Sequence, residues 1–271
     1  MPDIVGGTKD QHKIGLVLSG GGARGVAHLG MIQALEEQGL KFDIVAGASA
    51  GALVGALYCY GHTPKEISRF ISETNFLTIF RPSFNRRSLL NIEKAYDELR
   101  KHLPIDDFSS LKIPLHVSTT DIERGEPHIF EKGPLIKPVL ASCAIPVVFD
   151  AVTIGSRRLV DGGVTDNLPF QSIRKSSRKI IALHCNPIDD NSKMSNWSDL
   201  MERSMMIAIT RYVHSQKQYC DVFLEPTGLS KFKVIDFKKA DEIYVYGYNY
   251  ACEAIQNGIL NNLDSNEKEV L

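Results

Sequence analysis

The chain carries a serine in a setting that could make its hydroxyl a nucleophile. Ser49 lies at the centre of a G-x-S-x-G motif between Gly47 and Gly51. An apolar run, Ile44–Ala46, leads into the motif, and a helix-like run, Ala52–Leu57, follows it. This strand–turn–helix context is typical of a nucleophile elbow, in which small neighbours let the chain turn sharply and expose the hydroxyl. We interpret Ser49 as the nucleophile of a serine hydrolase, with a serine chosen only for close packing as the alternative.

A second glycine cluster, Gly20–Gly25, also joins an apolar run to a helix-like run. Its G-x-G-x-x-G pattern formally fits the dinucleotide fingerprint, which wants an acidic residue at the end of the second strand. The elbow around Ser49 takes that place. Consecutive glycines also leave backbone N–H groups free to bind an anion at a helix N-terminus, and a turn that needs positive φ suits both interpretations. We favour an oxyanion hole, built from Gly20, Gly21, Gly22 and Ala23.

A serine hydroxyl needs a base that removes its proton, and Asp161 is the first candidate. It follows the short apolar run Arg158–Val160 and precedes Gly162 and Gly163, which leave its carboxylate open on one side. From the spacing alone a plain turn is favoured here, because Asp-Gly is a strong hairpin signal.

A Ser–Asp–His triad of the α/β-hydrolase type is the competing arrangement. Only His184 and His214 follow Asp161, and His184 stands near the end of a predicted strand, a suitable place for a triad base. However, the elbow comes after only the second predicted strand, which is too early for that fold. A strand histidine held by hydrogen bonds is the better interpretation of His184.

Taken together, the motifs resemble those of the patatin-like phospholipases in order and spacing. The resemblance extends over about Ile14 to Phe170. The matching segments are Ser19–Gly25, Gly47–Gly51, Ala141–Pro146 with Phe149, Asp161–Gly163, and Asn167 with Pro169.

The resemblance implies a Ser–Asp dyad without histidine, with Ser49 as nucleophile, Asp161 as base and the glycine loop as oxyanion hole. It also implies hydrolysis of lipid acyl esters through an acyl-serine intermediate, of the phospholipase A or lysophospholipase type. A general carboxylesterase or thioesterase and a non-catalytic lipid-binding regulator are the alternatives. Arg24 is a candidate to hold a substrate phosphate or to support the loop, with a simple surface or packing role as the alternative. The further residues that support the motifs are Gly25, Gly47, Gly51, Gly162 and Gly163.

The elements that must position these residues alternate between strand and helix. Strands are predicted at 14–18, 42–46, 114–120, 127–131, 158–160, 179–185 and 222–224. Helices are predicted at 24–38, 50–60, 92–102, 135–142, 197–219 and 240–257, and one begins at the capping box of Thr63 and Glu66. This alternation predicts a three-layer αβα sandwich with a mostly parallel central sheet. We expect a single domain over 14–260, with flexible tails at 1–13 and 261–271.

Composition and charge exclude several classes of function. The 31 Lys and Arg residues balance 32 Asp and Glu residues, so no overall positive field favours nucleic acid. No apolar run approaches the ~18 residues of a membrane span, and the polar N-terminus lacks the apolar core of a secretory signal. Five cysteines without a C-x-x-C motif predict buried, reduced thiols. We expect a cytoplasmic or peripherally membrane-bound protein that needs neither metal nor cofactor.

Two further stretches carry predictions. Aromatic and basic residues mix between Phe76 and Arg87, which suits contact with a bilayer, aromatics at the interface and arginines near phosphates. A loop that covers the core with solvated arginines is the alternative. An apolar stripe at helical spacing runs from Met201 to Val213, and we expect it to face the core.

Overall fold

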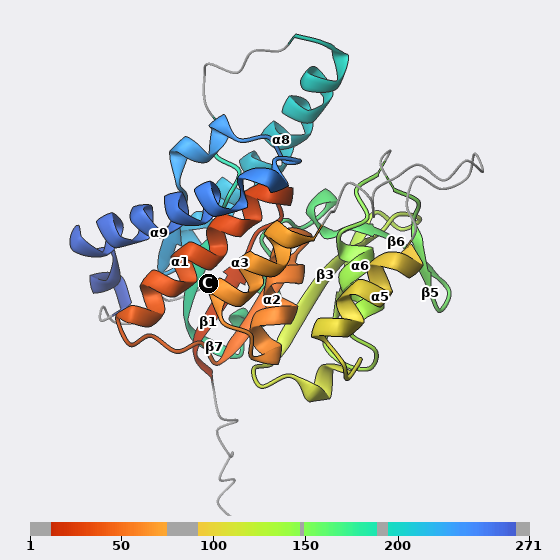
Figure 1. Ribbon diagram of the computed structural model, residues 1–271, viewed down its shortest axis with the longest axis horizontal. Helices are drawn as coiled ribbons and strands as arrows, with labels where there is room; N and C mark the ends of the chain where they lie inside the picture. Colours follow the sequence, from red (N-terminus) through yellow and green to blue (C-terminus); the bar gives the residue numbers. More distant parts are fainter. Residues whose placement is uncertain (1–11, 75–91, 147–148, 189–194, 264–271) are drawn as a thin grey trace, which may run out of the picture.

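The computed structural model describes residues 12–74, 92–146, 149–188 and 195–263 (Figure 1). The segment between Phe76 and Arg87, for which membrane contact and a loop over the core were both left open, lies outside them. Within the described residues eight strands form one sheet, in the order β5-β6-β3-β2-β1-β7-β8 with β4 paired to β3. The strands are β1 (His12–Leu18), β2 (Ile44–Ala48), β3 (Leu115–Asp121), β4 (Glu126–Phe130), β5 (Val152–Ile154), β6 (Arg157–Asp161), β7 (Ser177–Leu183) and β8 (Val222–Leu224).

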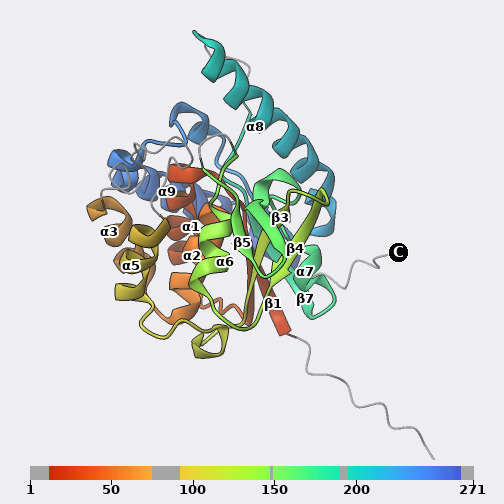
Figure 2. The same ribbon diagram turned by 90° about the vertical axis from the view of Figure 1, so that its right-hand side faces the viewer.

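Helices cover both faces of this sheet, as the predicted three-layer arrangement requires. Helices α1, α2, α3, α5, α6 and α9 lie on one face, and α7 and α8 lie on the other (Figure 2). Their bounds are α1 (Val26–Glu37), α2 (Ala50–Tyr60), α3 (Pro64–Glu73), α5 (Ile92–His102), α6 (Ile136–Ser142), α7 (Gln171–Arg174), α8 (Trp197–Gln216) and α9 (Ala240–Gln256). Short 3-10 turns are η1 (Gly22–Gly25), η2 (Phe108–Ser110), η3 (Gly162–Val164), η4 (Lys217–Tyr219), η5 (Thr227–Lys231), η6 (Phe237–Lys239) and η7 (Ile259–Leu263).

Strand direction decides which residues meet. Strands β1, β2, β3, β7 and β8 pair in parallel, so their carboxyl ends lie at one edge of the sheet, called here the carboxyl edge. The glycine cluster follows β1 and Ser49 follows β2, so both lie at this edge. Strands β4 and β6 instead pair antiparallel with β3, and β5 pairs antiparallel with β6. The sheet is therefore mostly parallel, as predicted, with an antiparallel extension on the β3 side.

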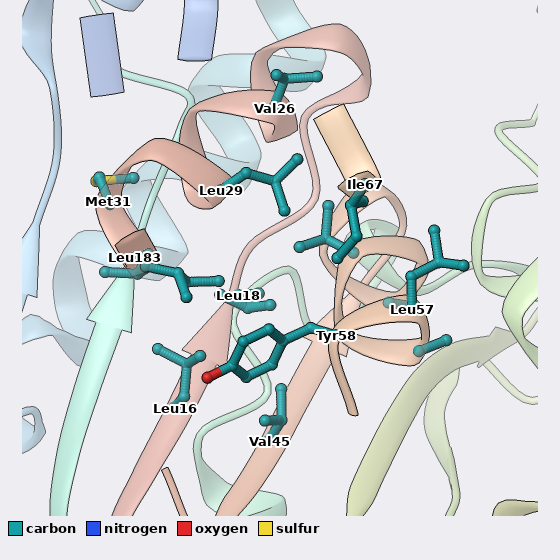
Figure 3. Close-up of a cluster of buried hydrophobic side chains, with 14 of the residues drawn as sticks. Leu16, Leu18, Val26, Leu29, Met31, Val45, Leu57, Tyr58, Ile67 and Leu183 are labelled. Carbon is teal, nitrogen blue, oxygen red and sulfur yellow. The ribbon is translucent and has the colours of Figure 1, made fainter. Parts of the chain in front are cut away.

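The core explains why the central strands read as continuous apolar runs. Leu16 and Leu18 of β1 point into the larger cluster, where they meet side chains of α1, α2 and α3 such as Leu29, Leu57 and Ile67 (Figure 3). Val17, between them in the chain, belongs to the smaller cluster on the α7 and α8 face. Because successive side chains of a strand alternate between faces, a strand covered on both faces must be apolar throughout.

Several predicted boundaries need correction. Strand β2 spans Ile44–Ala48 and not 42–46, because the small residues before Ser49 still pair with β3, up to Ala48 opposite Ser118. Both predicted tails are too long at their inner ends. Residues 12 and 13 belong to β1, and 261–263 belong to η7. Strand β5 and helix α7, of three and four residues, were not predicted from the sequence.

Helix α8 also departs from the prediction. Val213 is fully buried, but Met201 is 41% exposed, so the stripe between them is only partly core. The reason is that the first half of α8 projects past the rest of the fold (Figures 1 and 2). Among the described residues, no helix has both the length and the apolar character needed to cross a membrane.

Candidate active site

Ser49 stands on a strained turn between β2 and α2. Its φ of 52° and ψ of −123° make it the one non-glycine residue with positive φ among those described. Such a conformation costs on the order of 1–3 kcal/mol and persists only where surrounding contacts fix it. Here the Ser49 N–H donates to Ser142 Oγ at 2.8 Å, and Cys143 Sγ donates to the Ser49 carbonyl at 3.3 Å. A Cβ at Gly51 would meet the Leu18 carbonyl oxygen, so a glycine is required for β1 and the elbow to approach.

The Ser49 hydroxyl donates directly to Asp161, with 2.6 Å between Oγ and Oδ2. Both residues are 6% exposed. Asp161 ends β6, and its other carboxylate oxygen accepts from the Gly163 N–H at 2.7 Å. Its own N–H donates to the Ala144 carbonyl at 2.9 Å. The carboxylate is thus fixed in orientation by the turn that follows it, with one oxygen committed to Ser49.

Burial dominates the electrostatics of this pair. Desolvation raises the pKa of Asp161 to about 6, while the hydrogen bonds from Ser49 and Gly163 oppose the rise. Cys143 lies beside the pair, and burial together with the Asp161 charge raises the pKa of its thiol. The thiol therefore stays protonated at neutral pH and acts as a hydrogen-bond donor to the elbow.

The glycine loop divides into amides that hold the loop and amides that remain open. The Gly20 N–H donates to Asn167 Oδ1 at 3.1 Å, and the Ala23 N–H donates to the Val234 carbonyl at 2.8 Å. Within the described chain, the N–H groups of Gly21 and Gly22 make no hydrogen bond. Of the four predicted oxyanion donors, Gly20 and Ala23 are therefore occupied by structural bonds, and Gly21 and Gly22 are open.

The loop lies against the nucleophile and depends on glycine geometry. A Cβ added to Gly20 would stand 2.8 Å from Ser49 Cβ. Gly22 has a φ of +57°, which favours glycine, and a Cβ there would meet the Val234 carbonyl oxygen. The loop that carries the open N–H groups thus contacts the nucleophile at Gly20.

Buried polar side chains brace this loop from several elements. His28 Nε2 donates to the Ser19 carbonyl at 2.9 Å, and burial lowers the pKa of His28 to about 4, so the ring is neutral. Asn186 Nδ2 donates to the Gly20 carbonyl at 2.6 Å. Arg24 is 8% exposed and its Nε donates to the Phe232 carbonyl at 2.7 Å. This geometry favours the loop-supporting interpretation of Arg24 over a phosphate-binding one.

Several of these bracing residues were not predicted from the sequence to belong to the site. Ser142 and Asn167 stand in segments that match the family motifs, and no other feature of the sequence points to them. Asn186 and Val234 lie in irregular chain, where neither spacing nor periodicity points to them. They act through single hydrogen bonds to the loop, which a linear pattern does not encode.

The two histidines of the triad alternative lie together elsewhere. His184 is fully buried, and its Nδ1 lies 2.7 Å from Glu225 Oε1. His214 Nε2 lies 2.9 Å from the same oxygen. Burial lowers the pKa of His184. Within the described residues these three form the one cluster with donor atoms close enough, within 4.8 Å, to share a metal ion. Because they come from three distant elements, no ligand spacing in the sequence marked them.

The fold and site together define an α/β protein with a serine elbow, a facing aspartate and an open glycine loop. A model of the patatin-like phospholipase family matches residues 16–173. The chain belongs to the patatin-like phospholipase family.

Known proteins with similar sequences carry related names. Lysophospholipase NTE1 of Meyerozyma guilliermondii is 28% identical over 275 residues, which cover 89% of this chain and 19% of that protein. An uncharacterised NTE family protein of Mycobacterium bovis is 35% identical over 163 residues, 59% of this chain and 45% of that protein. The chain thus spans less than half the length of these two curated relatives.

Among solved structures, VipD from Legionella pneumophila has a TM-score of 0.58 at 14% sequence identity. The match covers 95% of this chain and 67% of VipD. At this identity the likeness shows the fold alone.

Proposed function

We propose that this chain is a lipid acyl hydrolase in which Ser49 is the nucleophile and Asp161 is the base. The observation that carries the proposal is the 2.6 Å hydrogen bond from Ser49 Oγ to Asp161 Oδ2, with no side chain between them. Membership of the patatin-like phospholipase family and similarity to a lysophospholipase support a lipid ester as substrate.

Acylation begins when Asp161 takes the proton of Ser49 Oγ as that oxygen bonds to the ester carbonyl carbon. The carbonyl oxygen becomes an oxyanion, and the open N–H groups of Gly21 and Gly22 are the donors that stabilise it. The tetrahedral intermediate then breaks its bond to the alcohol oxygen, and the alcohol leaves with the proton from Asp161. Water next attacks the acyl-Ser49 ester with Asp161 again as base, which releases the carboxylic acid and restores the serine.

The raised pKa of Asp161 suits this role. An ordinary aspartate, with a pKa near 4, is a weak base at neutral pH. Burial brings the pKa of Asp161 to about 6, which strengthens the base and still leaves it ionised at pH 7. A base near the operating pH makes a histidine unnecessary between the two residues.

We infer that the substrate is a phospholipid, cleaved in the manner of a phospholipase A or a lysophospholipase. A general carboxylesterase or thioesterase would prefer water-soluble short-chain esters or thioesters. A lipid-binding regulator on the same fold would hydrolyse neither, and the Ser49–Asp161 hydrogen bond together with the open Gly21 and Gly22 amides argues against it.

The test compares hydrolysis of diacyl phospholipid vesicles, lysophospholipid, neutral lipid, a short-chain nitrophenyl ester and an acyl thioester by the purified chain. In parallel, a fluorophosphonate probe reports an activated serine. We expect phospholipid or lysophospholipid turnover and labelling of Ser49, both lost in Ser49→Ala. Ser156→Ala, which changes an exposed serine of the β5–β6 turn, is the matched control and should keep both. Preference for the soluble ester or thioester would reassign the substrate, and absence of all turnover and labelling would favour the regulator.

A further inference from the structure

Exposed apolar side chains stand in three of the segments that form or brace the candidate site. Val164 follows Asp161 by three residues, Ile188 follows the loop-bracing Asn186 by two, and Ile235 adjoins Val234, whose carbonyl holds the Ala23 amide. All three are exposed, Ile235 to 65%. We call Val164, Ile188 and Ile235 the apolar rim. Large apolar side chains left exposed beside a site mark a surface that meets another apolar phase.

The outer face of α8 extends this rim. Thr210 Oγ1 donates to the Asn186 carbonyl at 2.9 Å, which anchors the second half of the helix beside the glycine loop. The first half then projects beyond the carboxyl edge (Figures 1 and 2). At helical spacing, exposed outer positions of α8 are Trp197, Leu200, Met201, Ser204, Ile207, Ala208 and Arg211. None of them is acidic, and Trp197 is 75% exposed.

The charged residues near Ile235 indicate what kind of partner this surface contacts. Ile235 stands in the segment 231–239, in which Lys233 and Lys238 are exposed on either side of it. A projecting aromatic residue, apolar anchors and flanking lysines together match the interfacial zone of a bilayer, where acyl chains lie beneath anionic phosphates. A second protein copy docked on the rim would instead cover Ser49.

We propose that the apolar rim and the outer face of α8 rest on an anionic phospholipid surface, with Lys233 and Lys238 at the phosphates. The inference builds on the proposed function, because the bilayer would hold the ester substrate. In this position Ser49 and the open amides of the glycine loop face the membrane, so a lipid would reach them without crossing bulk water.

The chain carries its own probe for this contact, since Trp197 is its single tryptophan. The experiment records the Trp197 emission of the Ser49→Ala protein as phosphatidylcholine vesicles are added, with and without phosphatidylserine. The inactive variant keeps the vesicles intact during the titration. We expect a blue shift with the anionic vesicles, quenching by lipids brominated in their acyl chains, and weaker binding to neutral vesicles or at high salt.

Variants then locate the contact in the same background. Ile235→Ser should weaken vesicle affinity by about tenfold, the loss expected when one buried isoleucine is removed from an apolar phase. Lys233→Gln with Lys238→Gln should abolish the preference for anionic vesicles. Ile105→Ser is the matched control, because Ile105 is also exposed, to 58%. Its segment lies at the edge of the sheet opposite the carboxyl edge, where the Lys112 N–H donates to the Cys59 carbonyl near the end of α2. This variant should bind like the parent, and circular dichroism checks the fold of each variant.

Two results would overturn the docking surface. One is an emission of Trp197 that does not change with vesicles of either composition. The other is a blue shift that follows protein concentration without lipid, which would assign the surface to a second copy of the chain. Hydrolysis of a soluble ester by the wild type separates this inference from the proposed function. Turnover without vesicle binding rejects only the docking surface, and vesicle binding without any turnover or fluorophosphonate labelling rejects only the hydrolase.

Discussion

Ser49 and Asp161 reach each other because they stand at the same level of strand β3, one from each side. Ala48 pairs with Ser118 in the parallel ladder, which puts Ser49 level with Thr119. Asp161 pairs with Thr119 in the antiparallel ladder, so β6 carries it to the same level from the opposite direction. A shift of one residue in either register would turn the side chain to the other face of the sheet.

The first prediction concerns the charge of Asp161. Asp161→Asn should remove almost all hydrolysis, because an amide nitrogen cannot accept the Ser49 proton. The variant should also be more stable than the wild type at pH 8. The folded-state pKa lies above the ordinary 3.8, at about 6, so the ionised carboxylate destabilises the fold above pH 6, by about 3 kcal/mol at most.

Urea unfolding of both proteins across pH measures this effect. The destabilisation is fully present above about pH 6 and is relieved as pH falls toward 4, because the folded state then takes up a proton more readily than the unfolded chain. The stability gain of Asp161→Asn should therefore shrink between pH 6 and pH 4. An equal gain at both pH values would show that the carboxylate is not buried as described.

The second prediction is the pH dependence of turnover. If the ionised Asp161 carboxylate is the base, kcat/KM should rise with pH through about 6 and then level off. Asp166 complicates this assignment, since burial raises its pKa to about 6 as well. The control is Asp166→Asn, which should keep the same rising limb. Disappearance of the limb in that variant would assign the titration to Asp166.

The third prediction separates two effects of glycine in the oxyanion loop. Gly22→Ala should lower kcat by about 10²–10³, the usual loss for one oxyanion donor, because the new Cβ meets the Val234 carbonyl and displaces the amides. Gly39→Ala is the matched control: Gly39 also has positive φ, +80°, but nothing lies within 4 Å of its Cβ position.

Gly39→Ala should therefore cost stability through backbone strain and leave kcat unchanged. Equal kcat values for the two variants would remove Gly22 from the oxyanion hole. Calorimetry with NAD is the accompanying check, and micromolar affinity would restore the dinucleotide interpretation of the loop.

The sequence was enough to predict the elements that carry local signals. Helix α2 spans 50–60 as predicted, with Gly61 after it in the left-handed conformation, and α3 begins at the predicted capping box of Thr63 and Glu66. Both features are encoded by a few adjacent residues. The candidate pair Ser49 and Asp161 was also found, although Asp161 could be separated from an ordinary Asp-Gly turn only by family resemblance.

Features that depend on contacts between distant segments were not predictable in the same way. Strand β6 runs antiparallel to β3, and the residue pattern of a five-residue strand does not indicate whether it pairs parallel or antiparallel. Likewise, the choice between open and occupied amides in the glycine loop depends on Asn167 and Val234, which lie 147 and 211 positions beyond their partners Gly20 and Ala23.

The last prediction distinguishes the dyad from a triad. His184 is a fully buried partner of Glu225, while Ser49 donates to Asp161 directly. His184→Gln keeps a hydrogen-bonding side chain at that place and should retain most of the wild-type kcat/KM. If a histidine were the base, the variant would lose activity to the same degree as Asp161→Asn, and the wild-type rate would rise with a histidine-like pKa near 6.5.

The measurement is kcat/KM across pH for the wild type, both variants and His214→Gln, with circular dichroism on each. Because a histidine limb near 6.5 lies close to the expected carboxylate limb near 6, the pH profile alone does not decide. The comparison of His184→Gln with Asp161→Asn does, and matched losses in two folded proteins would show that the Ser–Asp dyad is wrong.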